Sequence, residues 1–207
     1  MNTGVLFTIS APSGAGKTSL VKALVQRNPS IRISVSHTTR AKRPGEVDGQ
    51  DYFFVSKDEF IKRVNAGGFL EHAEVFGNYY GTSQRAVDDL LRQGQDVILE
   101  IDWQGASQVR RLRPGVVSVF ILPPSRTVLE QRLRDRGQDS EAVIARRLAA
   151  AREEISHYGE SDYLIINEDF EQALQELETV VRSQRLRREY QQTRFMDLIR
   201  QLLSQPS

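Results

Sequence analysis

A short loop of small residues follows the first apolar run of the chain and constrains its fold more than any other feature. Residues 5–9 have the composition of a buried strand, and residues 19–25 have a helical pattern. Between them, residues 11–18 are Ala-Pro-Ser-Gly-Ala-Gly-Lys-Thr. A strand, a small-residue loop, Gly-Lys-Thr and a helix in this order are typical of a phosphate-binding P-loop. A glycine-rich turn that precedes a lysine by chance would not explain both flanking elements.

Each part of the loop has a physical role in binding a nucleoside triphosphate. The glycines allow the loop to curl with its N–H groups pointing inward, and the helix that follows adds its N-terminal dipole. Lys17 can reach the β- and γ-phosphates, and the Thr18 hydroxyl can bind Mg²⁺. Ala11 replaces the first glycine of the general pattern, which is tolerable at negative φ. The predicted ATP-binding residues of the loop are Ala11, Pro12, Ser13, Gly14, Ala15, Gly16, Lys17 and Thr18.

Composition limits the classes of protein to which this chain can belong. With 207 residues, we expect one compact domain with inserted lobes. The net charge of +1 does not favour nucleic-acid binding, and the absence of cysteine excludes disulfides and thiol chemistry. The sequence has neither a secretion signal nor an apolar run of about 18 residues. We therefore expect a cytoplasmic protein that does not bind membranes.

Strand and helix patterns alternate along most of the chain, which predicts an α/β core with a parallel sheet flanked by helices. The expected strands are residues 5–10, 31–35, 97–101, 116–122 and 163–166. The expected helices are residues 17–27, 104–112, 125–136, 141–158 and 171–203, the last as one helix or two. Continuous apolar runs within the strands are typical of strands that are buried on both faces.

Two segments interrupt this alternation. Residues 36–93 are expected to form an α+β insertion, with short aromatic strands at 51–55 and 71–76. A capping box at residues 56–59 and the Gly67-Gly68 pair mark the ends of a helix within the insertion, and a second helix is expected at 83–93. Residues 126–161 are rich in arginine and mostly helical, as in a hinged flap.

The insertion begins with groups that suit a second phosphate. Arg40 and Arg43 lie three residues apart, and hydroxyl groups such as those of Ser36 and Tyr52 are close in the sequence. Guanidinium groups bind phosphate through paired hydrogen bonds. A solvated basic turn with its corner at Pro44 fits the local sequence equally well.

A carboxylate and a hydroxyl later in the insertion, those of Glu71 and Thr82, have the chemistry to recognise guanine. The carboxylate would accept hydrogen bonds from N1–H and the exocyclic amine, and the hydroxyl would donate to O6. Adenine has the opposite order of donors and acceptors at these positions. The structural alternative is a hairpin turn packed by residues 78–81.

Charged residues outside the insertion are candidates for metal binding and for phosphoryl transfer. Asp102 follows the strand 97–101, where it could hold Mg²⁺ through water, contact the second substrate or only cap a helix. Arg132 and Arg136 share one helix face, and Arg147 lies on the next helix. If these arginines face the P-loop, they would neutralise charge on the transferring phosphoryl group. A solvated helix face is the stronger explanation for Arg134, Arg146 and Arg152.

Together these residues resemble the guanylate kinase family over residues 4–185. The matching motifs are residues 11–18, 34–46, 49–55, 77–82, 100–105 and 132–137. The resemblance implies a P-loop core (1–35, 94–125 and 162–207), a GMP-binding lobe (36–93) and a lid (126–161). The implied GMP-binding residues are Ser36, Arg40, Arg43, Tyr52, Glu71, Tyr80, Thr82 and Asp102. Asn167 would lie near the adenine of ATP, and the implied catalytic residues are Lys17, Arg40, Arg43, Arg132, Arg136 and Arg147.

The implied reaction transfers the γ-phosphoryl group of MgATP to GMP, and to dGMP as well. The acceptor phosphate is already anionic at neutral pH, so we expect positioning and charge neutralisation without a general base. The alternatives are a guanylate-kinase-like protein-interaction module and a P-loop kinase of another small phosphorylated acceptor. The C-terminal segment is amphipathic and could pack on its own core or on another subunit, forming a homo-oligomer.

Overall fold

The computed structural model describes residues 3–135 and 140–204, with a parallel five-stranded sheet at its centre. The order of the strands is β2-β7-β1-β8-β9. Their bounds are Leu6–Ser10 for β1, Ile31–Ile33 for β2, Asp96–Glu100 for β7, Val117–Leu122 for β8 and Tyr163–Ile166 for β9. The P-loop follows β1, the central strand. The predicted α/β fold is therefore confirmed, although β2 is shorter than expected.

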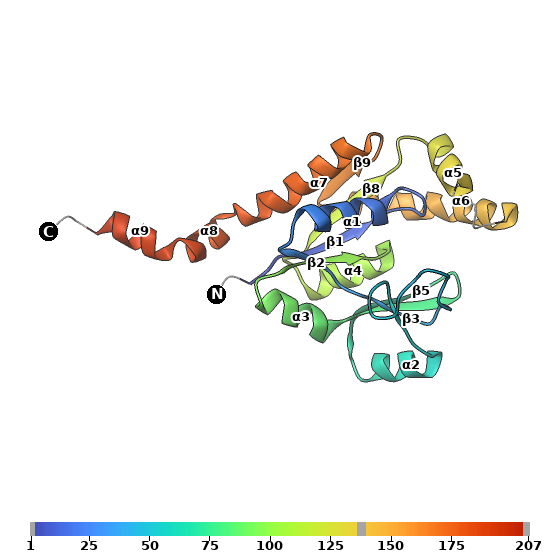
Figure 1. Ribbon diagram of the computed structural model, residues 1–207, viewed down its shortest axis with the longest axis horizontal. Helices are drawn as coiled ribbons and strands as arrows, with labels where there is room; N and C mark the ends of the chain where they lie inside the picture. Colours follow the sequence, from blue (N-terminus) through green and yellow to red (C-terminus); the bar gives the residue numbers. More distant parts are fainter. Residues whose placement is uncertain (1–2, 136–139, 205–207) are drawn as a thin grey trace.

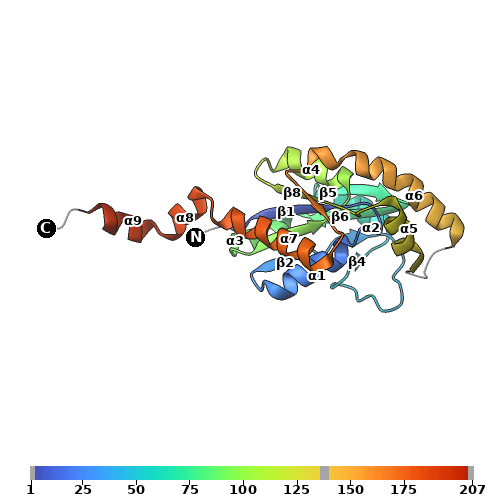
Figure 2. The same cartoon turned by 90° about the horizontal axis from the view of Figure 1, so that it is seen from above.

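Two hydrophobic clusters cover the two faces of this sheet (Figures 1 and 2). One face packs against α1 (Lys17–Arg27) and α7 (Phe170–Arg185), and the other packs against α3 (Gln84–Arg92) and α4 (Trp103–Leu112). In β7, Ile98 belongs to the first cluster, whereas Val97 and Leu99 belong to the second. Consecutive side chains of a strand point to opposite faces, so a sheet covered on both sides needs uninterrupted apolar strands.

The predicted insertion forms a second, four-stranded sheet in the order β4-β3-β6-β5. Its elements are β3 (His37–Thr38), β4 (Phe53–Phe54), α2 (Lys57–Asn65), β5 (Phe69–Val75) and β6 (Asn78–Ser83). The expected capping box is present in part, because the Ser56 hydroxyl accepts a hydrogen bond of 3.2 Å from the Glu59 N–H. The sequence prediction missed β3 and β6. The residues of β6 pair with β5 in an antiparallel ladder. The sequence was also compatible with a packed turn at residues 78–81.

The predicted flap is a pair of helices, α5 (Arg126–Asp135) and α6 (Glu141–Ser156), followed by the short helix η1 (Tyr158–Glu160). The two helices share a small apolar cluster that includes Leu129, Leu133, Ile144 and Ala151. Arg136 lies outside the described residues, and its role stays a prediction.

The C-terminal segment forms three helices, which corrects the expectation of one or two. After α7 come α8 (Arg188–Arg194) and α9 (Met196–Leu203), which extend away from both sheets in Figures 1 and 2. The break between α7 and α8 occurs at an exposed position, because Leu186 is 71% exposed. Within the residues that the structure describes, no helix is both long enough and apolar enough to cross a membrane.

Candidate active site

The P-loop has the backbone geometry that its glycines predict. Gly14 and Gly16 have φ values of 94° and 93°, and Gly16 is the N-cap of α1. Ala11 is not among the residues with positive φ; in the described ranges, Phe76 alone among non-glycine residues has this conformation. The condition for replacing the first glycine by alanine is therefore met, and the loop keeps its curl.

One flank of the loop is held by Asn167 and Arg132. The Asn167 amide donates to the Ala15 carbonyl at 2.7 Å, and the Arg132 guanidinium donates to the Asn167 carbonyl at 2.9 Å. A Cβ on Gly16 would lie 2.3 Å from the Asn167 Nδ2 atom, so only glycine allows this close approach. A cavity on this flank is lined by Gly14, Gly16, Ser19, Arg132, Asp135, Asn167, Glu168 and Phe170.

Asn167 has unused hydrogen-bonding capacity beside this cavity. Its side chain is 3% exposed, and its Oδ1 atom has no hydrogen-bond partner among the described residues. A buried acceptor without a partner is costly unless a ligand or a water molecule satisfies it. The arrangement is compatible with the predicted neighbour, an adenine with its exocyclic amine, but that role stays a prediction.

On the other flank, Thr18 contacts the last residue of β7, and Lys17 contacts the residue that follows it. The Lys17 ammonium donates to the Ile101 carbonyl at 3.0 Å, and the Thr18 hydroxyl donates to the Glu100 carboxylate. Hydroxyl and carboxylate oxygens are suitable ligands for Mg²⁺. No group of three or more His, Cys, Asp or Glu residues in the described chain forms a metal cluster by itself. Thr18 and Glu100 therefore fit a metal ion whose other ligands are phosphate oxygens and water.

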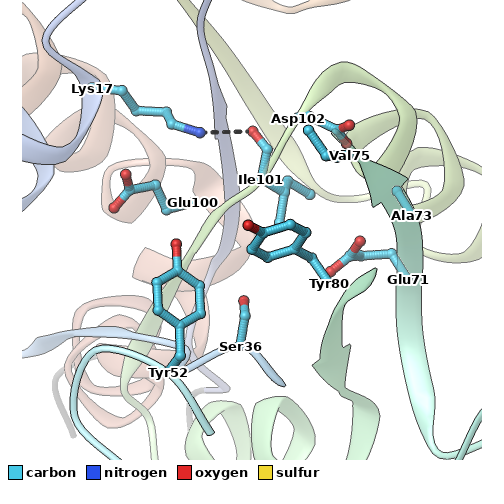
Figure 3. A pocket seen from close by; sticks show the side chains of 10 residues that line it. All are labelled: Lys17, Ser36, Tyr52, Glu71, Ala73, Val75, Tyr80, Glu100, Ile101 and Asp102. Carbon is cyan, nitrogen blue, oxygen red and sulfur yellow. Dashed lines mark hydrogen bonds between the residues drawn. The ribbon is translucent and has the colours of Figure 1, made fainter. Parts of the chain in front are cut away.

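A second cavity connects the P-loop with the inserted lobe. Its lining residues are Lys17, Ser36, Tyr52, Glu71, Ala73, Val75, Tyr80, Glu100, Ile101 and Asp102. Five residues expected to bind the acceptor thus line one space with Lys17. Figure 3 shows Lys17 and Glu100 on one side of this space and Glu71 on the other.

Glu71 is the most deeply buried charged group of this cavity, with 3% of the residue exposed. The Thr82 hydroxyl donates to its carboxylate at 2.5 Å and lies 3.5 Å from the Ser36 hydroxyl. Burial raises the pKa of Glu71 to about 7, and the negative charge of Asp102 adds to this shift. The hydrogen bond from Thr82 and the positive charge of Lys17 oppose this shift, because both lower the pKa of Glu71. The pair suggested by the sequence is thus in direct contact.

Gly105 makes room for the Glu71 carboxylate, a role that the sequence did not suggest. A Cβ at this position would lie 2.6 Å from the Glu71 Oε2 atom. The only local signal is a glycine inside the first turn of a helix, which is unusual because glycine disfavours helices.

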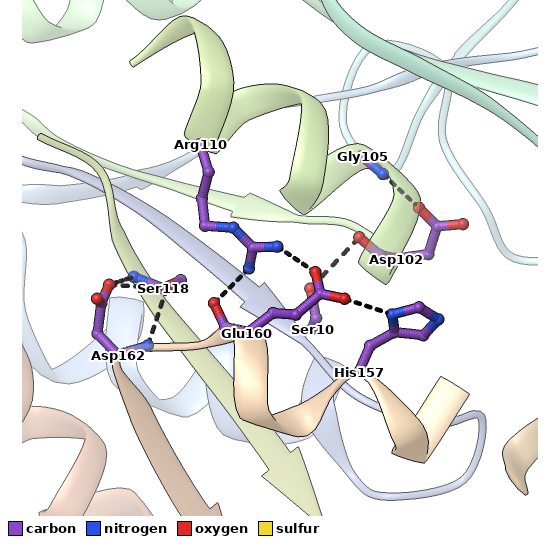
Figure 4. Close-up of polar contacts among 8 residues, drawn as sticks. All are labelled: Ser10, Asp102, Gly105, Arg110, Ser118, His157, Glu160 and Asp162. Atoms are coloured by element: carbon purple, nitrogen blue, oxygen red, sulfur yellow. Dashed lines mark hydrogen bonds and ion pairs between the residues drawn. The ribbon is translucent and has the colours of Figure 1, made fainter. Parts of the chain in front are cut away.

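Asp102 both caps a helix and lines the cavity. Its Oδ1 atom accepts a hydrogen bond of 2.9 Å from the Gly105 N–H, at the N-terminus of α4 (Figure 4). Its Oδ2 atom accepts from the Gln104 amide at 3.3 Å. The capping interpretation is therefore correct, and Glu100 rather than Asp102 contacts the Thr18 hydroxyl.

Arg40 and Arg43 lie outside the lining of this cavity. The Arg40 guanidinium forms an ion pair of 2.6 Å with Glu46 and lies 5.4 Å from the centre of the Tyr52 ring. The Glu46 carboxylate also accepts a hydrogen bond of 2.8 Å from the Arg43 backbone N–H. Glu46, which the sequence prediction did not include, thus connects the two arginines. The Tyr52 ring connects Arg40 to the cavity.

The flap contacts the P-loop through α6 as well as through Arg132 of α5. An Arg147 guanidinium nitrogen lies 3.3 Å from the Ser13 hydroxyl, and the Ser13 N–H donates to the Glu154 carboxylate at 3.0 Å. Arg134 instead pairs with Glu130 and Glu141 at the surface, as expected of a solvated position. Sequence reasoning missed Glu154, because its partner lies 141 residues away in the chain.

The end of the flap is fastened to α4. The Trp103 and His157 rings stack with centroids 3.6 Å apart. His157 Nδ1 lies 2.6 Å from the Glu160 carboxylate, and Arg110 donates to the Glu160 carbonyl at 2.6 Å (Figure 4). The helix that begins beside Asp102 therefore also anchors the exit from the flap.

Comparison with known proteins identifies the family of this chain. The family model described as guanylate kinase matches residues 4–184. The chain belongs to the guanylate kinase family. It is 60% identical to the guanylate kinase of Hahella chejuensis over 207 residues, which is 100% of both chains. It is 56% identical to that of Escherichia coli K12, covering 99% of this chain and 100% of the relative.

A solved structure agrees with this family assignment. The crystal structure of guanylate kinase from Anaplasma phagocytophilum superposes with a TM-score of 0.76 at 36% identity, over 90% of this chain and 89% of that one. Membership in the guanylate kinase family confirms the resemblance drawn from the six sequence motifs. It also confirms that the chain is an enzyme of the kinase class, and neither alternative function is favoured.

Proposed function

We propose that this kinase transfers the γ-phosphoryl group of MgATP to GMP, and to dGMP as well, giving ADP and GDP. The observation that supports this most directly is the cavity that Lys17 of the P-loop shares with the buried Glu71. A donor site and a guanine-recognition site that meet in one space provide the in-line positioning that phosphoryl transfer needs.

On the donor side, the curled P-loop N–H groups and Lys17 would bind the phosphates of ATP. Thr18 and Glu100, whose side chains are in contact, would hold Mg²⁺, with Asp102 acting through water. When bound, Mg²⁺ would neutralise charge on the β- and γ-phosphates. Asn167 would lie beside the adenine.

On the acceptor side, Glu71 and Thr82 would bind the guanine edge, with Ser36 next to them. Arg40 and Arg43 would bind the GMP phosphate with the hydroxyls of Tyr52 and Tyr80. The Glu46 carboxylate that now contacts both arginines would keep their side of the lobe ordered until the phosphate arrives. No general base is required, because the attacking phosphate oxygen is already anionic.

We assign the parts of the chain to a core (1–35, 94–125 and 162–207), a GMP-binding lobe (36–93) and a lid (126–161). The contacts of Arg132 and Arg147 with the P-loop support a lid whose arginines neutralise the transferring group. A closed lid would exclude water and suppress ATP hydrolysis. We further propose a cytoplasmic enzyme, and a homo-oligomer formed through the exposed helices α8 and α9.

Steady-state ADP release with GMP, dGMP, AMP, UMP and ribose phosphates as acceptors tests the acceptor assignment. We expect activity with GMP and dGMP only. A preference for AMP, or no response to GMP, would refute the guanine assignment.

The Lys17→Ala variant tests the donor site. It should abolish turnover and leave GMP binding largely intact, because Lys17 acts on the ATP phosphates. Lys22→Ala on the same helix is a matched control, since the Lys22 side chain is 60% exposed and 4.0 Å from Asp51. Near-normal turnover of Lys17→Ala would contradict the P-loop assignment.

A further inference from the structure

The lid helix α6 places a negative charge against the P-loop. Glu154 lies near the C-terminal end of α6, and its Oε2 atom accepts the hydrogen bond from the Ser13 N–H at 3.0 Å. The N–H groups of a P-loop are the groups that bind phosphate oxygens. In this structure, one of them is occupied by a carboxylate of the protein itself.

The surroundings of Glu154 are those expected of a phosphate. Burial raises its pKa, while the Ser13 N–H and the charges of Lys17 and Arg147 lower it in opposition. The negative charge of Asp102 adds to the effect of burial and raises the pKa as well. Lys17 and Arg147 are the residues that we assign to the terminal phosphate of ATP. The carboxylate therefore lies among the positive groups of the donor site, where the terminal phosphate would need to be.

We infer that Glu154 is a positioning residue that takes the place of the terminal phosphate in the empty enzyme and is displaced when MgATP binds. This inference rests on the proposed function. Two anions cannot share one N–H donor without strong repulsion. Binding of ATP would therefore separate Glu154 from Ser13 and remove one contact that holds α6 against the P-loop. The position of the lid would in this way be coupled to the terminal phosphate.

Calorimetric titration of MgATP and MgADP, without GMP, tests this inference on the Glu154→Gln variant. Glutamine keeps the size and a hydrogen-bond acceptor but removes the charge. We expect MgATP to bind about fivefold more tightly than to the wild type, with the affinity for MgADP unchanged. Glu153→Gln is the matched control, because Glu153 precedes it on α6 and is exposed. This control should bind both nucleotides like the wild type.

Steady-state kinetics provide a second measurement, which would not change if Glu154 had a purely structural role. In Glu154→Gln, the KM for ATP should fall, while the KM for GMP stays the same. Unchanged or weaker MgATP binding would overturn the inference, since Glu154 would then only support the loop. Equal gains for MgATP and MgADP would overturn the assignment to the terminal phosphate. An enzyme that binds MgATP but does not phosphorylate GMP would instead refute the proposed function and leave this test valid.

Discussion

At the scale of single residues, Glu71 sets the pH range in which guanine can be bound. Burial raises its pKa to about 7, so the carboxyl is largely protonated at pH 6 and largely ionised at pH 8. Only the ionised form can accept from both guanine N1–H and the exocyclic amine. We therefore expect the Kd for GMP to rise about tenfold from pH 8 to pH 6.

Calorimetry of GMP binding at several pH values checks this prediction, with Glu71→Gln as the control. The GMP phosphate also titrates near pH 6, and its contribution is common to both proteins. The wild type should lose affinity more steeply than the variant as pH falls. Parallel pH profiles would show that Glu71 does not titrate in this range.

Gly105 provides a second prediction at this scale. Alanine is normally preferred over glycine in a helix by about 1 kcal/mol, but here its Cβ would lie 2.6 Å from the Glu71 Oε2 atom. Gly105→Ala should therefore displace the carboxylate and weaken GMP binding about tenfold or more, a loss of about 1.4 kcal/mol. The affinity for MgATP should not change. In Gly115→Ala, where the added Cβ has no neighbour within 4 Å, both affinities should stay at wild-type values.

Three residues, Glu71, Gly105 and Glu154, show how far sequence reasoning reaches into the site. Glu71 could be predicted, because a carboxylate near a hydroxyl has recognisable chemistry whatever surrounds it. Gly105 and Glu154 could not, because each acts through a partner that is distant in the chain. Their roles depend on how α4 packs against β5 and how α6 packs against the P-loop, and no local pattern encodes these contacts.

At the scale of elements, the β5–β6 hairpin turns through Phe76 and Gly77, with φ values of 50° and 78°. Two-residue turns of this kind favour Asn-Gly, and a bulky residue in the left-handed region costs about 1–2 kcal/mol. The Phe76 ring is exposed, and the Arg146 guanidinium lies 5.4 Å from its centre. Such an exposed cation–π contact contributes only about 0.5–1 kcal/mol.

Phe76→Asn should therefore raise the free energy of unfolding, by about 0.5–1 kcal/mol. Urea denaturation measures the change. Phe53 is similarly exposed, at 39%, but lies in β4 without a positive φ, and the centre of its ring lies 4.8 Å from that of His37. Phe53→Asn should therefore lower stability. A loss of stability in Phe76→Asn would mean that the contact with Arg146 outweighs the backbone strain.

The same hairpin illustrates which elements a sequence can predict. Long apolar strands such as β8, and helices with a capping residue such as α2, follow from local patterns. The two-residue strand β3 does not, because it exists only through pairing with its neighbours β4 and β6. The amphipathic pattern continues past Leu186, although none of the described residues of α8 and α9 is buried, so the three helices of the C-terminal segment could not be foreseen.

At the scale of the whole molecule, the proposed site lies where three parts of the chain meet. The P-loop comes from the central sheet, Glu71 and Thr82 come from the second sheet, and Glu154 comes from the flap. The insertion and the flap could be predicted because each is continuous in the sequence and interrupts the alternation of strands and helices in the core. Their contacts are set by tertiary packing, which brings Ser13 and Glu154 together across most of the chain.

The helix α9 is not needed for this arrangement, and its apolar face is exposed. Leu198 and Leu202 lie one helical turn apart and are 50% and 75% exposed. No described residue of α9 is buried. Separating α9 from another subunit should therefore leave the core unchanged. If the proposed homo-oligomer forms through this face, a charge there should disrupt it without changing turnover.

Sedimentation velocity on the double variant Leu198→Asp, Leu202→Asp checks this prediction. We expect the wild type to sediment as an oligomer and the double variant as a single chain, with equal kcat and equal thermal midpoints. Leu112→Asp is the control, because Leu112 is 61% exposed but belongs to α4 and not to the C-terminal helices. This control should keep the oligomer, since its charge lies outside the proposed contact. A monomeric wild type, or an oligomer that survives both aspartates, would mean that α9 does not hold the subunits together.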